Sequence, residues 1–105
     1  MKSILANEDN KSCWLCGATH GEHLDRHHVY GGGMRQQSEK YGLVVYLCHS
    51  SCHEYGERAV HQNKVTRELL QAQSQKRAME YYGWSVKDWM DRFYKNYMED
   101  FINGV

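Results

Sequence analysis

The sequence of 105 residues contains no proline and no excess of charge of either sign, because 13 Lys and Arg balance 13 Asp and Glu. The absence of proline argues against a linker-rich or disordered chain. The absence of net positive charge counts against nucleic-acid binding, since basic side chains supply most of the affinity for phosphates. It does not exclude such binding, because a bound divalent cation adds charge that a residue count omits.

Long apolar runs are also absent. No stretch reaches the length of a membrane-spanning helix, and residues 1–13 lack the apolar run of a secretion signal. We therefore expect no membrane partner and a cytoplasmic location, where thiols stay reduced. In a reducing compartment, four cysteines in two close pairs are more often metal ligands than disulfides.

What the chain does have is enough apolar material for one small folded domain. Hydrophobic residues make up 41% of the sequence and aromatic residues 12%, a composition that argues against intrinsic disorder. A chain of this length buries a limited fraction of its surface, so stabilisation by a metal or a partner is plausible.

The first half of the chain predicts two strands and the start of a helix. Residues 24–30 and the apolar, β-branched residues 43–47 are typical of strands. Between them, the glycines at 31–33 should break the first strand, and we interpret the polar residues 34–40 as a loop. A helix should begin within residues 48–55.

The second half predicts helices. Residues 63–82 contain only good or neutral helix formers, and Gly83 should end this helix. Ser85 offers an N-cap for a further helix, with Asp88 three residues on as in a capping box. Aromatic residues then recur at four-residue intervals, at Trp89, Phe93, Tyr97 and Phe101. We interpret this stripe as a packing face, with a base-stacking or docking surface as the alternative.

Two pairs of cysteines are spaced as metal clips. Cys13-x2-Cys16 is a standard clip, and Cys48-x3-Cys52, about thirty residues later, has one extra residue. Positions four apart on a helix share a face, so Cys48 and Cys52 can still converge. His49-x2-Cys52 has the standard spacing, which leaves His49 as the alternative to Cys48. We expect the two clips to bind one tetrahedral zinc ion. One alternative is that the cysteines are buried free thiols. The other is a redox site at the C-x2-C clip, although the βαβ context that is usual for such sites is absent from the sequence.

Several of the seven histidines lie beside these clips. His27 and His28 are adjacent in the first expected strand, so they point to opposite faces and can take different roles. His53 directly follows Cys52, which places its imidazole at a position that a zinc clip would hold rigidly. His61 is either a further metal ligand or an exposed loop histidine.

The order of these motifs resembles the HNH (His-Me finger) endonucleases, which combine a cysteine clip, a histidine pair at a strand end, an apolar strand and a Cys-His step. Residues 26–63 are similar to small phage and prophage HNH proteins, in the run RHHVYGGGMRQQSEKYGLVVYLCHSSCHEYGERAVHQN. Residues 83–98 resemble the tail of those proteins, in the run GWSVKDWMDRFYKNYM. The resemblance implies an α+β fold with a zinc-stapled ββα-metal core over residues 1–62. A C-terminal helical hairpin over residues 63–105 would complete a single compact domain.

The resemblance also implies two metal sites. A structural zinc would be held by four thiolates, those of Cys13, Cys16, Cys48 and Cys52. A catalytic divalent metal, which is Mg²⁺, Mn²⁺, Ni²⁺ or Zn²⁺ in such proteins, would be held by three imidazoles, those of His27, His53 and His61. Ligation by nitrogen alone favours a transition metal over magnesium.

Around the catalytic metal, the resemblance implies that His28 is the general base and that Asp25 orients a ligand. Arg35 is a candidate phosphate clamp, as is Arg58, and plain surface charge is the alternative for each. The family's middle asparagine, which steadies the base, should fall near residues 42–43, a Gly-Leu pair. Because no asparagine stands there, either a backbone carbonyl holds His28 or the base is less well oriented.

These roles predict a metal-dependent endonuclease that hydrolyses phosphodiester bonds in DNA. The alternative is a non-catalytic zinc-binding adaptor for nucleic acid or protein, which would keep the cysteine site and lose the second metal. DNA is the expected partner, and the aromatic C-terminal helix is a candidate surface for a second copy of the chain or for a phage or recombination protein. The likeness to phage and prophage proteins implies a bacterial host cell as the setting.

Overall fold

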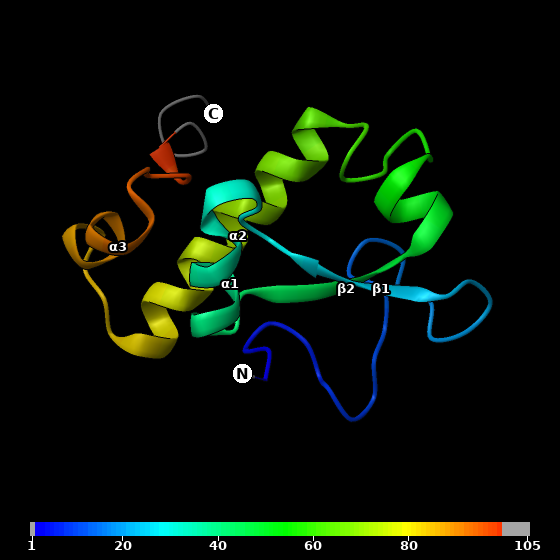
Figure 1. Cartoon of the computed structure of the whole chain (residues 1–105), viewed down its shortest axis with the longest axis horizontal. Coiled ribbons are helices and arrows are strands. Elements are labelled where there is room, and N and C mark those ends of the chain that lie inside the picture. The colour runs from blue at the N-terminus through cyan, green and yellow to red at the C-terminus, as the bar shows by residue number, and fades with distance from the viewer. Residues whose placement is uncertain (1, 100–105) are drawn as a thin grey trace.

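The computed structural model describes residues 2–99, which form a small α+β protein. Its elements in chain order are β1 (Leu24–His28), η1 (Gly32–Met34), α1 (Arg35–Tyr41), β2 (Val44–Cys48), η2 (His49–Glu54), α2 (Lys64–Tyr82) and α3 (Val86–Phe93). Figure 1 shows the β1–β2 hairpin across the middle of the molecule, with α3 at one end and the green coil of η2 toward the other. The expected α+β class is confirmed.

The β-hairpin places the histidine pair opposite the apolar second strand. In the antiparallel register, His27 lies opposite Val45 and His28 lies opposite Val44. β2 is buried along its whole length, whereas β1 is partly exposed. His27 and His28 therefore lie near the surface, on a strand that is paired with the buried strand β2.

A loop before β1 runs along the second edge of β2. Cys13 forms an isolated parallel bridge with Tyr46, and the Trp14 N–H donates to the Tyr46 carbonyl at 2.8 Å. These contacts use backbone groups on the side of β2 that faces away from β1. They hold the first cysteine clip beside the end of β2, where the second clip begins.

Residues 34–40 are helical rather than the expected loop. The 3-10 turn η1 leads into α1, and Gly42 ends α1 in the left-handed conformation, at φ 73°. A Cβ at Gly42 would also lie 2.6 Å from the Lys2 carbonyl oxygen, so only glycine fits there. The buried side chain of α1 is Ser38, whose hydroxyl donates to the Tyr30 carbonyl at 2.8 Å and accepts from the Tyr30 N–H at 3.0 Å. Tyr41 of α1 also packs against the core, but the other residues of α1 are polar or charged, so the helix has no apolar stripe for a sequence pattern to reveal.

The helix expected within residues 48–55 is a short π-helix, η2. A carboxylate from a distant loop caps its first turn: Glu22 Oε1 accepts from the N–H of Ser50 at 2.7 Å and from the N–H of Ser51 at 3.1 Å. Glu22 also accepts from the Ser51 hydroxyl at 2.5 Å. These bonds satisfy backbone donors at the start of the turn that carries the buried Cys52.

Helix α2 begins and ends, and helix α3 begins, close to where the sequence predicts. Asn63 caps α2, its Oδ1 accepting from the N–H of Thr66 at 3.0 Å, and Gly83 ends the helix in the left-handed conformation. Ser85 and Asp88 form the expected reciprocal capping box at the start of α3. The signals for these two helices are local, which is why the sequence alone locates them.

The aromatic stripe is a packing face in α3, but the helix ends earlier than the stripe predicts. Trp89 and Phe93 are buried and stack with ring centroids 4.1 Å apart. The next residue has a left-handed backbone, with φ 64°, so α3 stops at Phe93. Tyr97 then reaches Tyr30 from beyond the helix, with centroids 4.7 Å apart. The fourth expected member, Phe101, lies outside the described residues.

One hydrophobic cluster joins the two predicted segments of the chain. Tyr30, from the predicted core, packs on Trp89, from the predicted extension, with ring centroids 5.3 Å apart. The boundary between residues 1–62 and 63–105 stays a prediction. Within residues 2–99, no helix is long and apolar enough to cross a membrane.

Candidate metal centres

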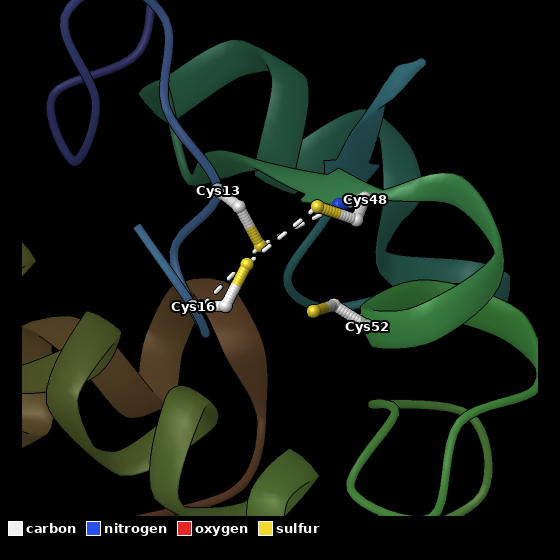
Figure 2. Close-up of side chains that lie close together, drawn as sticks. All are labelled: Cys13, Cys16, Cys48 and Cys52. Carbon is white, nitrogen blue, oxygen red and sulfur yellow. Dashed lines mark hydrogen bonds between the residues drawn. The ribbon is translucent and has the colours of Figure 1, made fainter. Parts of the chain in front are cut away.

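The four cysteines meet at one place although they come from two distant segments. Figure 2 shows their side chains pointing into a shared space, with Cys13 and Cys16 on the N-terminal loop and Cys48 and Cys52 at the end of β2 and on η2. The four sulfur atoms lie within 4.8 Å of one another, and those of Cys16 and Cys48 are 3.6 Å apart. This arrangement is geometrically compatible with a structural metal such as zinc, for which four thiolates are a common ligand set.

Electrostatics within the cysteine cluster favour ionisation of one thiol. Burial opposes ionisation of Cys13, but the backbone N–H groups of Cys16 and Cys48, each 3.5 Å from its sulfur, lower its pKa to about 7. Burial and the neighbouring thiols raise the pKa of Cys48 to about 11 and that of Cys52 to about 12. A bound divalent cation would stabilise all four thiolates, so the cluster has the chemistry of a cation site.

Cys48, rather than the alternative His49, belongs to this cluster. His49 turns away: its Nδ1 lies 2.6 Å from Asp25 Oδ2, and half of its side chain is exposed. The extra residue in the second clip is accommodated by η2, because a π-helical turn contains more residues than an α-helical one. The unusual spacing therefore still brings Cys48 and Cys52 together.

Three histidines from separate parts of the chain form a second cluster. β1 carries His27, η2 carries His53, and the loop before α2 carries His61. His53 Nε2 lies 3.2 Å from His27 Nδ1 and 3.0 Å from His61 Nε2. One nitrogen of each ring lies within 4.8 Å of the other two. Imidazole sets of this kind suit transition metals such as zinc or nickel.

Asp25 contacts the far nitrogen of His53 and so sets its tautomer. Asp25 Oδ2 lies 2.8 Å from His53 Nδ1. Burial alone would raise the pKa of Asp25, but hydrogen bonds from His53 and His49 lower it, so the group is ionised. Since a carboxylate only accepts hydrogen bonds, Nδ1 of His53 donates to Asp25, and Nε2 is the ring nitrogen that faces His27 and His61.

His27 is held in its neutral form. Burial, followed by repulsion from the neighbouring imidazoles, lowers the pKa of His27 to about 3. Neutral imidazole is the form that binds metals. Because one nitrogen of His53 and one of His61 lie within 4.8 Å of a His27 nitrogen, a cation could bind all three rings.

The histidine cluster opens into a surface hollow of about 290 Å³. Its lining residues are Arg26, His27, His28, Gly31, Gly32, Arg35, His53 and His61. A wider hollow of about 580 Å³ adjoins it, and the two share His28, Gly32 and Arg35. His28 and Arg35 therefore stand beside the histidine cluster and line both hollows, whereas Arg58 lines neither.

The sequence does not single out Glu39, which contacts the predicted base. Glu39 Oε1 lies 3.4 Å from His28 Nε2, and the two carboxylate oxygens lie 2.6 and 2.8 Å from the guanidinium of Arg26. Hydrogen bonding with Arg26 lowers the pKa of Glu39 to about 2, so the carboxylate is ionised. Glu39 lies on α1, whose one clear signal in the sequence is the helix-ending Gly42.

The two clusters are joined through η2 and the loop that follows it. Cys52 of the first cluster and His53 of the second are consecutive residues. The N–H of Val60 donates to the Cys52 carbonyl at 2.9 Å, and the N–H of His61 donates to the His53 carbonyl at 3.1 Å. The guanidinium of Arg67 donates to the Val60 carbonyl at 3.2 Å. The loop that carries His61 is thus held by the same turn that carries a cysteine.

Comparison with family models, curated proteins and solved structures found no match for this chain. The resemblance to the HNH endonucleases therefore rests on the sequence motifs, and the roles that it implies stay predictions. The geometry brings the predicted ligands together in two groups, one of four cysteines and one of three histidines.

Proposed function

We propose that the protein is a metal-dependent endonuclease of the HNH type, which hydrolyses phosphodiester bonds in DNA. The observation that carries this proposal is the convergence of ring nitrogens from His27, His53 and His61 within 4.8 Å, in a hollow that also contains His28. The succession of β1, β2 and η2 around this point supports a ββα-metal core.

The residues present fit a catalytic metal. His27, His53 and His61 would hold it, and Asp25 keeps His53 in the tautomer that a ligand needs. When bound, the metal supplies Lewis-acid stabilisation to the scissile phosphate and to the leaving oxygen. The cysteine cluster would hold a structural zinc and stabilise the turn from which His53 projects.

Two further side chains supply the remaining chemistry. His28, in its neutral form, accepts a proton from the water that attacks phosphorus. Arg35, exposed at the start of α1 and lining both hollows, donates to a phosphate oxygen and offsets its charge. The protein thereby provides the base and the charge stabilisation that phosphodiester hydrolysis requires.

The glycine-rich loop beside His28 suits a large substrate. Gly31, Gly32 and Gly33 are exposed, and a Cβ built at any of them would have no atom within 4 Å. Because these three residues have no side chains, this side of the hollow is open, which allows a nucleic-acid backbone to approach. The chain has no net positive charge to attract DNA, but at the site itself Arg35 and a bound divalent cation would supply positive charge.

Cleavage of supercoiled plasmid by the zinc-loaded protein, with added Mn²⁺, Mg²⁺ or Ni²⁺, tests the proposal. Wild type should cut, and His28→Ala should cut more slowly by a factor of about 10² to 10⁴ while it keeps its zinc and its fold. His20→Ala is the matched control, because His20 is an exposed loop histidine outside both hollows. Equal cleavage by wild type and His28→Ala would remove His28 from the mechanism.

Counting metals by native mass spectrometry separates the nuclease from the adaptor. The nuclease proposal expects two metals per chain in wild type and one in His61→Ala. A wild-type protein that binds a single metal, lost only when cysteines are replaced, and that cuts no DNA would be a zinc-stabilised adaptor instead.

A further inference from the structure

Glu39 is a carboxylate in a site proposed to bind a polyanion. It lines the wider hollow together with His28 and Arg35, and 42% of its side chain is exposed. Its negative charge repels phosphate, so it does not favour substrate binding directly. Its place beside His28 points instead to an effect on that side chain.

Arg26 holds the Glu39 carboxylate in a fixed orientation. The two terminal nitrogens of Arg26 donate to the two oxygens of Glu39, at 2.6 and 2.8 Å. A fork of this kind sets the plane of the carboxylate and offsets its charge. It also directs Glu39 Oε1 at His28, whose Nε2 lies 3.4 Å away.

We propose that Glu39 is a positioning residue that holds His28 in the tautomer with the proton on Nε2, so that Nδ1 is the nitrogen that accepts a proton from water. Because an ionised carboxylate only accepts hydrogen bonds, Nε2–H of His28 is the donor in this contact. The catalytic consequence rests on the proposed function, whereas the tautomer does not. Glu39 would supply the orienting contact for which the chain has no asparagine at residues 42–43.

The tautomer matters because a general base works only when the nitrogen that faces the water lacks a proton. The two neutral tautomers of an unconstrained imidazole interconvert, and a carboxylate that accepts from one nitrogen favours one of them. The aspartate of Ser-His-Asp hydrolases acts on its histidine in this way. Removing Glu39 should therefore reduce the fraction of productive His28 without weakening substrate binding.

Nitrogen NMR of the zinc-loaded protein tests the tautomer directly. At about pH 8, where ordinary imidazoles are neutral, His28 of wild type should carry its proton on Nε2. Glu39→Gln should keep that tautomer, because its amide oxygen still accepts from Nε2–H, and Glu39→Ala should give a mixture. Glu68→Ala is the matched control, since Glu68 is also a helical glutamate with 36% of its side chain exposed and pairs with Lys64. It should leave His28 unchanged.

Steady-state cleavage then measures the catalytic consequence. Glu39→Ala should lower kcat about 10- to 100-fold. KM should stay constant or fall, because a negative charge beside the substrate has been removed. Glu39→Gln should recover most of the rate, and Glu68→Ala should cut like wild type.

The two proposals fail in different ways. An unchanged His28 tautomer in Glu39→Ala overturns the positioning role, whatever the cleavage rate. Equal losses of the free energy of unfolding in Glu39→Gln and Glu39→Ala would also overturn it, because the Arg26–Glu39 pair would then serve only to hold α1 against β1. A His28→Ala protein that cuts like wild type overturns the nuclease mechanism, while the NMR result still decides whether Glu39 orients the imidazole.

Discussion

Tyr30 illustrates how single residues connect this small fold. It follows β1 and is almost wholly buried, yet its hydroxyl donates to the Gln71 carbonyl in α2. Burial raises the pKa of Tyr30 well above its ordinary value, so the phenol keeps its proton. Its ring also packs against Trp89, Phe93 and Tyr97, with centroids 5.3, 5.1 and 4.7 Å away. One side chain thus contacts both C-terminal helices from the end of the hairpin.

The contributions of the Tyr30 hydroxyl and of the Tyr30 ring to stability can be measured separately by substitution. Tyr30→Phe removes the hydroxyl and should lower the free energy of unfolding by about 1 kcal/mol. Tyr30→Ala also removes the ring and should cost about 3–5 kcal/mol. Urea unfolding measures both, with Tyr94→Phe as the control, because Tyr94 is 70% exposed. If Tyr30→Phe is as unstable as Tyr30→Ala, the ring contacts contribute little.

Residue spacing predicts the ligands of the candidate site better than it predicts their neighbours. The clips Cys13-x2-Cys16 and Cys48-x3-Cys52 could be recognised because ligands to one ion are close in sequence within each clip. The contact of Glu39 with His28 could not, since it depends on how α1 packs against β1. A polar contact between distant positions leaves no periodic pattern in the chain.

At the scale of the element, the predictable helices are those whose ends are specified locally. Asn63 and Ser85 cap α2 and α3 through side chains that bond within their own first turns. The start of η2, in contrast, is capped by Glu22 from another loop, and α1 is fixed to the fold by the buried Ser38. Neither tertiary contact has a local sequence signal, which is why the sequence predicts a loop where α1 forms.

The caps can be tested by replacing them. Asn63→Ala and Ser85→Ala should each lower the free energy of unfolding by about 1 kcal/mol, because a backbone N–H in the first turn loses its acceptor. Asn63→Asp is the control and should stay close to wild type, since aspartate caps helices as well as asparagine does. Chemical denaturation gives these differences, and an Asp variant as unstable as the Ala variant would argue that the cap bond is not the cause.

At the scale of the whole molecule, the cysteine cluster connects parts of the chain that lie far apart in the sequence. It joins the N-terminal loop to the end of β2 and to η2, and it lies within the hydrophobic core through Cys13, Cys48 and Cys52. An ion bound there would act as a cross-link in a fold with a small core. The order of the chain around this point should depend on that ion.

Removal of the metal should therefore destabilise the entire protein. We expect a strong chelator, or Cys52→Ser, to lower the melting temperature by more than about 10 °C, since a loss of a few kcal/mol has that effect in a domain of this size. Ser50→Ala is a neighbouring control, because Ser50 is exposed, contacts Glu22 through its backbone N–H and leaves all four thiols in place. Differential scanning calorimetry with parallel zinc analysis gives the answer, and a chelated protein that melts like the loaded one would show that the cysteines hold no structural ion.

The adjacency of Cys52 and His53 has a consequence for how such a protein would fail. The peptide bond between Cys52 and His53 links the two clusters directly, and the loop with His61 is hydrogen-bonded to the carbonyls of these same two residues. A reagent that removes Cys52 from the cysteine cluster would therefore also move the His53 imidazole away from His27 and His61. If the proposed function is correct, loss of zinc would then stop cleavage although no side chain that contacts the substrate has been altered.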